Sequence, residues 1–343
     1  MNQKFASQKV TVNDSIEAVN NLYIEKGWSD GLPIIPPTQQ AVENMLSGTN
    51  RKSYDALAKI PPIWGEATIE KIAINAVMAG CLPEYMPVII TAIEAMCDEK
   101  FRLVEIQPTT HPVAPLIIVN GPIANKLGIN SKAGAFGPCW RANATIGRAI
   151  RLILLNIGGA YPSKLDLSTQ GQPAKYTYCI AENEEESPWE PLHVERGFPS
   201  ATSTVTVVAC ENPHNINEHV GINGAEVLTS ICNAVISTGT NNVLFQGGTP
   251  VIALCPEHAA AITAVGFSKQ DVRNYIYENS KMSLRRFYPR QIETYFPGWD
   301  ENALVPICKR KEDLIIIVVG GTGKHSSYLP AFLPPSVTKA IAE

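Results

Sequence analysis

Short runs of apolar, mainly β-branched residues recur along the chain and stop abruptly at Gly, Pro or Asn. Such continuous runs are typical of strands that are buried on both faces, as in parallel sheets covered by helices. The pattern therefore predicts short, mostly parallel strands. The candidate strands are 102–111 (RLVEIQPTTH), 114–122 (APLIIVNGP), 203–213 (STVTVVACENP), 249–258 (TPVIALCPEH) and 313–325 (DLIIIVVGGTGKH).

Predicted helices occupy the intervals between these runs. Gly80 suits the left-handed end of one helix, and Pro83 suits the first turn of the next, where its missing N–H costs nothing. The alternation of strands with covering helices predicts an α/β fold. The predicted helices are 13–27, 68–79, 144–156 and 225–238.

Two patterns in the sequence occur twice. A strand, then Gly-Pro or Asn-Pro, then Gly-Ile-Asn and a helix follow one another from Leu116 and again from Val205. The stretches 80–93 (GCLPEYMPVIITAI) and 254–265 (LCPEHAAAITAV) share a Cys, a Pro-Glu and an Ile-Thr-Ala. This ordered recurrence predicts an internal duplication. Gly128 and Gly221 then occupy equivalent turns of segments 116–157 and 205–238. The expected organisation is an N-terminal arm and helix over 1–65, a first α/β half with an acidic lid segment over 66–200, and a second half over 201–343.

Composition narrows the class of protein. The net charge of −4 and the pI near 5.9 argue against a nucleic-acid partner. No apolar run approaches the ~18 residues of a membrane span, and the first residues do not resemble a signal peptide. The eight cysteines lack a Cys-x-x-Cys pair, which favours free thiols in a reducing cytoplasm. We expect a small-molecule partner, no nucleic acid and no membrane, with a homo-oligomer as an open alternative.

The chemistry that the sequence suggests centres on two cysteines. Cys81 and Cys255 each precede a proline-started helix, where free N–H groups and the helix dipole favour a thiolate. Two related halves would bring both thiols to one cleft. The expected catalytic residues are Cys81 and Cys255, with Glu84, His258 and His325 as proton-handling partners.

Further polar residues lie at or beyond apparent strand ends, where ligands bind in α/β sheets. No cofactor is predicted, and a metal ion remains an alternative because Cys and His are common ligands. The expected substrate-binding residues are His111, Asn120, Arg141, Asn143, Glu182 and Lys324. The alternative metal ligands are Cys210, His214, Cys255 and His258.

Four further segments complete the set of candidates. Residues 320–325 (GGTGKH) depart from a Walker A loop, yet their glycine N–H groups suit an anion. Segment 181–198 is acidic and then aromatic, which predicts an ordered lid. Residues 27–38 (GWSDGLPIIPPT) are expected to form a packed arm. Cys139 lies in a Gly-rich loop before a helix, which suits an anion or a close backbone approach.

Six stretches together resemble the UGSC family, a largely uncharacterised group that includes selenoproteins. They include WSDGLPIIPPT from Trp28, AGCLPEYMPVIITAIEA from Ala79, RANATIGRAIRLIL from Arg141 and IALCPEHAAAITAVGFSKQDVRNYI from Ile252. The selenocysteine-Gly-Ser-Cys motif that names the family is absent. The resemblance implies thiol or selenol chemistry and supplies no substrate.

These observations predict a cysteine-dependent enzyme of lyase or hydrolase type that acts on a small anionic, carboxylate-bearing substrate. Three alternatives remain open at this point. They are a thiol–disulfide oxidoreductase, a metal or iron–sulfur enzyme, and a non-catalytic ligand-binding subunit.

Overall fold

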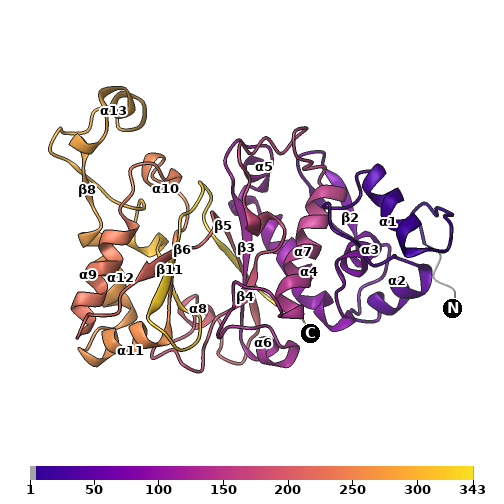
Figure 1. Cartoon of the computed structure of the whole chain (residues 1–343), viewed down its shortest axis with the longest axis horizontal. Coiled ribbons are helices and arrows are strands. Elements are labelled where there is room, and N and C mark those ends of the chain that lie inside the picture. Colours follow the sequence, from indigo (N-terminus) through magenta and orange to yellow (C-terminus); the bar gives the residue numbers. More distant parts are fainter. Residues whose placement is uncertain (1–4, 343) are drawn as a thin grey trace.

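The computed structural model describes residues 5–342 as a mixed α/β fold in which two sheets lie face to face between two layers of helices (Figure 1). Alternate residues of each strand enter different cores. In the first sheet Leu116 and Ile118 face the second sheet, whereas Ile117 faces the helices. In the second sheet Ile317 faces the first sheet and Ile316 faces its own helices. Every central strand is therefore buried on both faces.

Each sheet has four strands. The first has the order β12-β5-β3-β4, with β3 at Ala114–Asn120, β4 at Cys179–Ala181, β5 at Thr204–Cys210 and β12 at Val337–Ala340. The second has the order β10-β7-β11-β6, with β6 at His214–Asn217, β7 at Val251–Leu254, β10 at Ile315–Val318 and β11 at His325–Leu329. Two small antiparallel sheets have two strands each. In the first, β1 (Ala56–Ile60) pairs with β2 (Gly65–Thr68), and in the second, β8 (Met282–Ser283) pairs with β9 (Leu304–Val305) across a connection that contains a helix.

The prediction of mostly parallel strands is wrong. Only β3 with β4 and β7 with β10 run parallel within the part of the chain that the structure describes. The other ladders are antiparallel. The apolar runs were correct indicators of burial on both faces, but one face is covered by the opposite sheet instead of by helices, and such burial does not depend on strand direction.

The two sheets match each other in strand order and direction, although by a different correspondence from the expected one. In the first, β3, β4 and β5 follow one another and the chain then crosses to supply β6 to the second sheet. In the second, β7, β10 and β11 follow one another and the chain crosses back to supply β12. Segments 116–157 and 205–238 do not fold alike, because the second contains this crossing. Gly128 is left-handed at a helix end, and Gly221 is not in that region.

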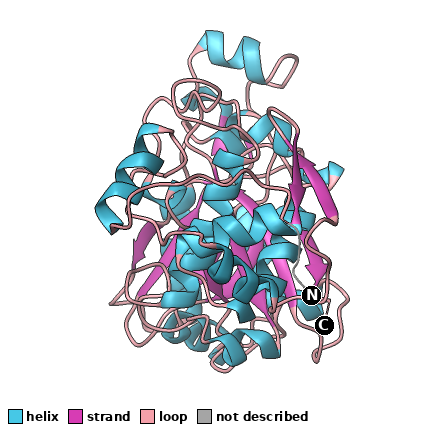
Figure 2. Cartoon of the chain, turned by 90° about the vertical axis from the view of Figure 1, so that its right-hand side faces the viewer, coloured by secondary structure: helices cyan, strands magenta, loops and turns pink. Residues whose placement is uncertain are grey.

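Helices form the two outer layers, and the view from the N-terminal side shows the first layer in front of the strands (Figure 2). The helices on the side of the first sheet are α1 (Ile16–Glu25), α2 (Gln39–Leu46), α3 (Ile69–Ala79), α4 (Met86–Met96), α5 (Leu103–Ile106), α6 (Pro122–Leu127) and α7 (Arg141–Asn156). The remaining helices are α8 (Leu192–Glu195), α9 (Gly224–Val235), α10 (Asn241–Leu244), α11 (Pro256–Ala264), α12 (Lys269–Asn279) and α13 (Pro289–Tyr295). No helix in residues 5–342 is both long and apolar enough to cross a bilayer.

The strand predicted over 102–111 is absent, and α5 lies there instead. Leu103 and Ile106 are buried while Val104 and Glu105 are exposed. This three-residue spacing places the two buried side chains on one face of a helical turn. The four residues 103–106 are too few for their apolar pattern to distinguish the period of a helix from that of a strand.

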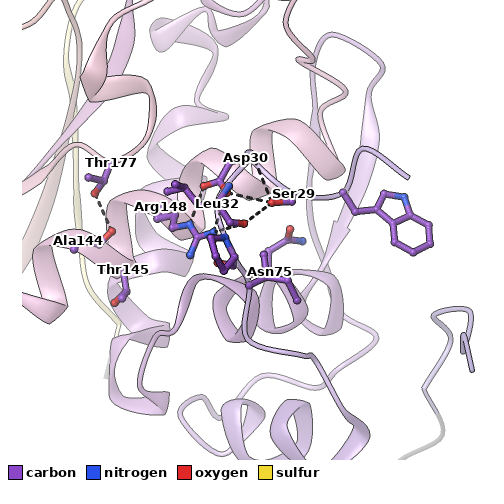
Figure 3. A network of polar contacts seen from close by, with 12 residues as sticks. Ser29, Asp30, Leu32, Asn75, Ala144, Thr145, Arg148 and Thr177 are labelled. Carbon is purple, nitrogen blue, oxygen red and sulfur yellow. Dashed lines mark hydrogen bonds and ion pairs between the residues drawn. The ribbon is translucent and has the colours of Figure 1, made fainter. Parts of the chain in front are cut away.

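An ion pair holds the extended segment 27–38 against the first helical layer, as expected for a packed arm (Figure 3). Arg148 of α7 binds both carboxylate oxygens of Asp30 at 2.8 Å. The same guanidinium donates to the carbonyl oxygens of Leu32 at 3.3 Å and Pro33 at 2.9 Å. The Asp30 side chain is 3% exposed and that of Arg148 16% exposed, so water screens this pair little.

Arg148→Met should lower the free energy of unfolding by about 3–5 kcal/mol, because it leaves the buried Asp30 carboxylate without its partner. Urea denaturation measures the effect. Arg51→Met is the matched control, since Arg51 pairs with Glu94 at the surface and should contribute less than about 1 kcal/mol. Equal losses in the two variants would contradict the role of the Asp30 pair.

Candidate functional site

Cys255 stands where β7 ends and α11 begins. Its backbone is extended, with φ −69° and ψ 156°, and its Sγ accepts the N–H of His258 at 3.4 Å, so the thiol acts as the N-cap of α11. Pro256 occupies the first turn, where no N–H is needed. The Cys-Pro sequence thus serves the start of the helix and also fixes the thiol at the end of a central strand.

Ser326 of β11 links Cys255 to His258. Its Oγ accepts the Cys255 N–H at 3.0 Å and lies 2.7 Å from His258 Nδ1. On the far side of the ring, Nε2 lies 2.9 Å from the carbonyl oxygen of Glu218. Because a carbonyl only accepts, Nε2 carries the proton, and in the neutral ring Nδ1 accepts from the Ser326 hydroxyl. The result is an imidazole with a fixed tautomer beside a hydroxyl group and a thiol.

Burial controls the ionisation of this thiol. Cys255 is 1% exposed, and desolvation raises its pKa above the ordinary value. The hydrogen bond from the His258 N–H opposes that shift without reversing it. The expected thiolate is therefore wrong for Cys255, which is a neutral thiol at pH 7 until a base takes its proton.

One lysine and two histidines gather at the surface above the buried cluster. Lys324 Nζ donates to the carbonyl oxygen of His219 at 3.3 Å, and the Nε2 atoms of His219 and His325 lie 3.1 Å apart. His325 Nδ1 lies 3.0 Å from Asn215 Oδ1. The Glu218 carboxylate is held by the Ser230 hydroxyl and two backbone N–H groups, which lower its pKa to about 2.

The glycine-rich segment 320–324 connects β10 to β11 and lies next to this cluster. The Gly323 N–H donates to the Glu257 carboxylate at 2.8 Å, and the Gly320 N–H donates to the Ser131 carbonyl at 2.8 Å. Two of the N–H groups expected to hold an anion are thus already used within the protein. Gly320 and Gly323 have φ of 113° and 131°, a region that favours glycine.

Cys81 does not join Cys255. It belongs to the core of the first helical layer, whereas Cys255 begins a helix of the second layer, and both sheets lie between them. The thiol donates to the Thr145 carbonyl at 3.2 Å, and burial raises its pKa to about 12. Pro83 begins a short 3-10 turn rather than α4 itself, so Cys81 lies outside the helix start. The prediction that Cys81 and Cys255 share one cleft is therefore wrong. The prediction that Cys81 is a thiolate is wrong as well, because the thiol is buried away from a helix start.

The residues expected to act together with Cys81 do not gather around one cleft. Glu84 is exposed on the 3-10 turn. Arg141 donates through Nε and Nη2 to the Gly80 carbonyl, at 3.2 and 3.0 Å. Asn143 is buried and binds the backbone of Asn130 and Ala135. Arg141 and Asn143 thus support local backbone, and neither lies with Lys324.

Asn120 and Glu182 meet at the ends of β3 and β4. Asn120 Nδ2 donates to Glu182 Oε2 at 2.6 Å and to Glu184 Oε1 at 2.9 Å, and the Leu192 N–H binds the same Glu182 oxygen at 2.8 Å. Burial raises the pKa of Glu182. Glu182 Oε1, Asn120 Oδ1 and Thr204 Oγ1 are buried without a partner in the described residues. These contacts attach the acidic segment 181–198 to the sheet, and the segment is ordered as expected, with Leu192 buried.

The alternative metal ligands do not assemble. Cys210 is buried at the end of β5, and His214 is exposed at the start of β6, opposite Tyr328. His111, which was expected to bind substrate, has its Nε2 2.9 Å from Glu211 Oε1, and its ring stacks on that of Phe332. Within residues 5–342 no group of three or more His, Cys, Asp or Glu side chains is arranged to hold a metal ion.

The sequence pattern found Cys255, His258, Lys324 and His325, and the structure places these four around one strand end. It missed Ser326 because a lone serine inside a strand carries no signal of its own. His219 and Glu218 were also missed, since they follow β6, a polar edge strand that no apolar run marks. Ser326 could have been found from the sequence because it directly follows His325, which was already a candidate.

No family model matches the chain, and searches of curated proteins and of solved structures likewise found no match.

Alkylation with iodoacetamide at pH 7 should label Cys139 first, because it is the exposed cysteine among the eight. Cys81 should be nearly inert, since a pKa of about 12 leaves a thiolate fraction of ~10⁻⁵ at pH 7 against ~3% for a reference thiol. Peptide mass spectrometry over time measures each rate. Labelling of Cys81 as fast as Cys139 in the native protein would contradict this order, and labelling in urea provides the control for all eight sites.

Proposed function

We propose that the protein is a cysteine-dependent enzyme that acts on a small anionic, carboxylate-bearing molecule at the Cys255 site, with chemistry of the lyase or hydrolase type. The observation that carries the proposal is the Ser326 hydroxyl, whose Oγ accepts the Cys255 N–H at 3.0 Å and lies 2.7 Å from His258 Nδ1, while the Cys255 thiol accepts the His258 N–H. A nucleophile, a base and a group that orients the base are the parts that covalent catalysis requires.

These residues support a balanced proton transfer. The thiol proton of Cys255 passes to Ser326 Oγ while the Ser326 proton passes to His258 Nδ1. The products are a thiolate and an imidazolium, and the Glu218 carbonyl, which accepts from Nε2, stabilises the charged ring. The thiolate then forms a bond to an electrophilic carbon of the substrate, the bond between that carbon and its leaving group breaks with the electron pair going to the leaving group, and the imidazolium gives its proton to the leaving group.

Such chemistry requires access to a thiol that is now covered. Segment 320–324 is the proposed cover, because its two glycines at positive φ permit backbone movement once the hydrogen bonds of Gly323 to Glu257 and of Gly320 to Ser131 break. The same burial that raises the pKa of Cys255 keeps the thiol protected from oxidation while the cover is closed.

The proposed preference for an anion rests on the side chains beside the cover. Lys324, His219 and His325 surround the approach to Cys255, and the Glu218 carboxylate is already occupied by its own hydrogen bonds. A carboxylate arriving at this surface meets the Lys324 ammonium group and two imidazole rings that carry N–H donors.

Two further features support the proposal. The matched strand order of the sheets supports an internal duplication, in which β7 with α11 corresponds to β3 with α6. Asn120 and Gly121 then stand where Cys255 stands, so one of two equivalent strand ends would have acquired the thiol. The resemblance to the UGSC family supports thiol chemistry in general.

His258→Gln and Ser326→Ala should each slow iodoacetamide labelling of Cys255 at pH 7 by about 10²-fold, because each removes a member of the proton relay. Mass spectrometry follows the Cys255 peptide, with Cys139 in the same sample as an internal reference. His214→Gln is the matched control, since His214 is exposed and away from the relay. Labelling that is unchanged or faster in both relay variants would refute the relay.

The anion preference has a separate test. The test compares the labelling rates of Cys255 with iodoacetate and with iodoacetamide. Both reagents need the cover to open, so the frequency of opening drops out of the ratio of the two rates. Lys324→Met should lower this ratio severalfold, whereas Lys309→Met, at an exposed lysine elsewhere, should leave it unchanged. A ratio at Cys255 no higher than that at Cys139 would exclude an anion-selective site.

A further inference from the structure

A cavity of about 590 Å³ lies on the first helical layer, away from Cys255. Its walls come from α7, from the loop 161–176 that follows α7, and from Ser29 and Asp30 of the packed arm. This volume lies in the ordinary range for sites that bind small molecules. None of the residues expected from the sequence to bind substrate lines it.

Three charged side chains meet in the wall of this cavity. The Asp166 carboxylate is buried, and its Oδ2 binds Lys175 Nζ at 2.6 Å and Arg151 Nη2 at 3.1 Å. Its Oδ1 accepts the Ser168 N–H at 3.1 Å, so both carboxylate oxygens have partners. The cations remain accessible, with side chains 13% exposed for Lys175 and 12% for Arg151.

The charges around the cavity do not cancel. Arg151 and Lys175 carry two positive charges against the single negative charge of Asp166. The other acidic residue of the wall, Asp30, is already neutralised by its two bonds to Arg148. One unit of positive charge is therefore left at a half-enclosed surface, where solvent screens it less than at an open one.

Both cations also keep unused donors. Lys175 has three N–H groups and one carboxylate partner, and Arg151 Nε and Nη1 have no partner in residues 5–342. Burial lowers the pKa of Lys175, which shows that its surroundings disfavour the ammonium charge in spite of Asp166. A bound anion would relieve that cost and satisfy the free donors.

We infer that this cavity binds a small molecule through a carboxylate or phosphate group held by Arg151 and Lys175. The planar guanidinium and the compact ammonium together suit an oxyanion with two or more oxygens. Tyr161 and Pro173 supply apolar wall for the remainder of the ligand. Asp166 positions the two cations and does not itself contact the anion.

Isothermal titration calorimetry of the whole protein tests this inference, with sodium phosphate and sodium succinate as probes and sodium chloride at equal ionic strength as the blank. We expect saturable 1:1 binding of at least one probe in the millimolar range or tighter. Phosphate binding alone assigns a phosphate ligand, and succinate binding alone a carboxylate ligand. Absence of saturable binding of both probes would overturn the inference.

Variants locate the binding. Lys175→Met should weaken it about tenfold or more, whereas Lys164→Met should not change it, since Lys164 is exposed and does not line the cavity. Gln170→Glu leaves the buried residues unaltered, because Gln170 is an exposed residue at the edge of the cavity. The carboxylate that it adds should repel the anion and weaken binding. Its control is Thr169→Glu, next in sequence but outside the lining. Equal binding in Gln170→Glu and Thr169→Glu would also contradict the inference.

Discussion

The contact between the two sheets is the constraint from which the rest of the architecture follows. Leu116 and Ile118 on one side meet Ile315 and Ile317 on the other, and none is more than a few per cent exposed. With helices on the opposite faces, the central strands have no solvent-facing side. The thiol of Cys255 stands accordingly at the end of β7, where the sheet gives way to a helix start.

The sequence identified the buried strands but not their directions. The runs around β3, β5, β7 and β10 were correctly placed, because burial on both faces leaves a continuous apolar signature. Parallel and antiparallel neighbours share that signature, so the direction could not be inferred. Strands β6 and β12 were missed because their sequences, HNIN and VTKA, are polar at one or more faces and depend on pairing partners far along the chain.

The site was predictable where it depended on local sequence and not where it depended on packing. Cys255, His258 and His325 follow strand ends, and their proximity could be inferred from that position. Cys81 has a similar local sequence but lies in the other layer. The thiolate prediction failed for a quantitative reason. At Cys255 a helix start favours a negative charge by about 0.3–1 kcal/mol, and burial outweighs it and raises the pKa. Cys81 has no helix start beside it, and burial raises its pKa to about 12.

The crossing of β6 and β12 between the sheets has a consequence for how the chain reaches its fold. The first sheet receives β12 only after the whole second sheet has been synthesised, so β5 stays an open edge while about 130 residues emerge. An open apolar edge can pair with other chains. During translation the edge of the first sheet at β5 therefore has no strand of this chain beside it until β12 emerges.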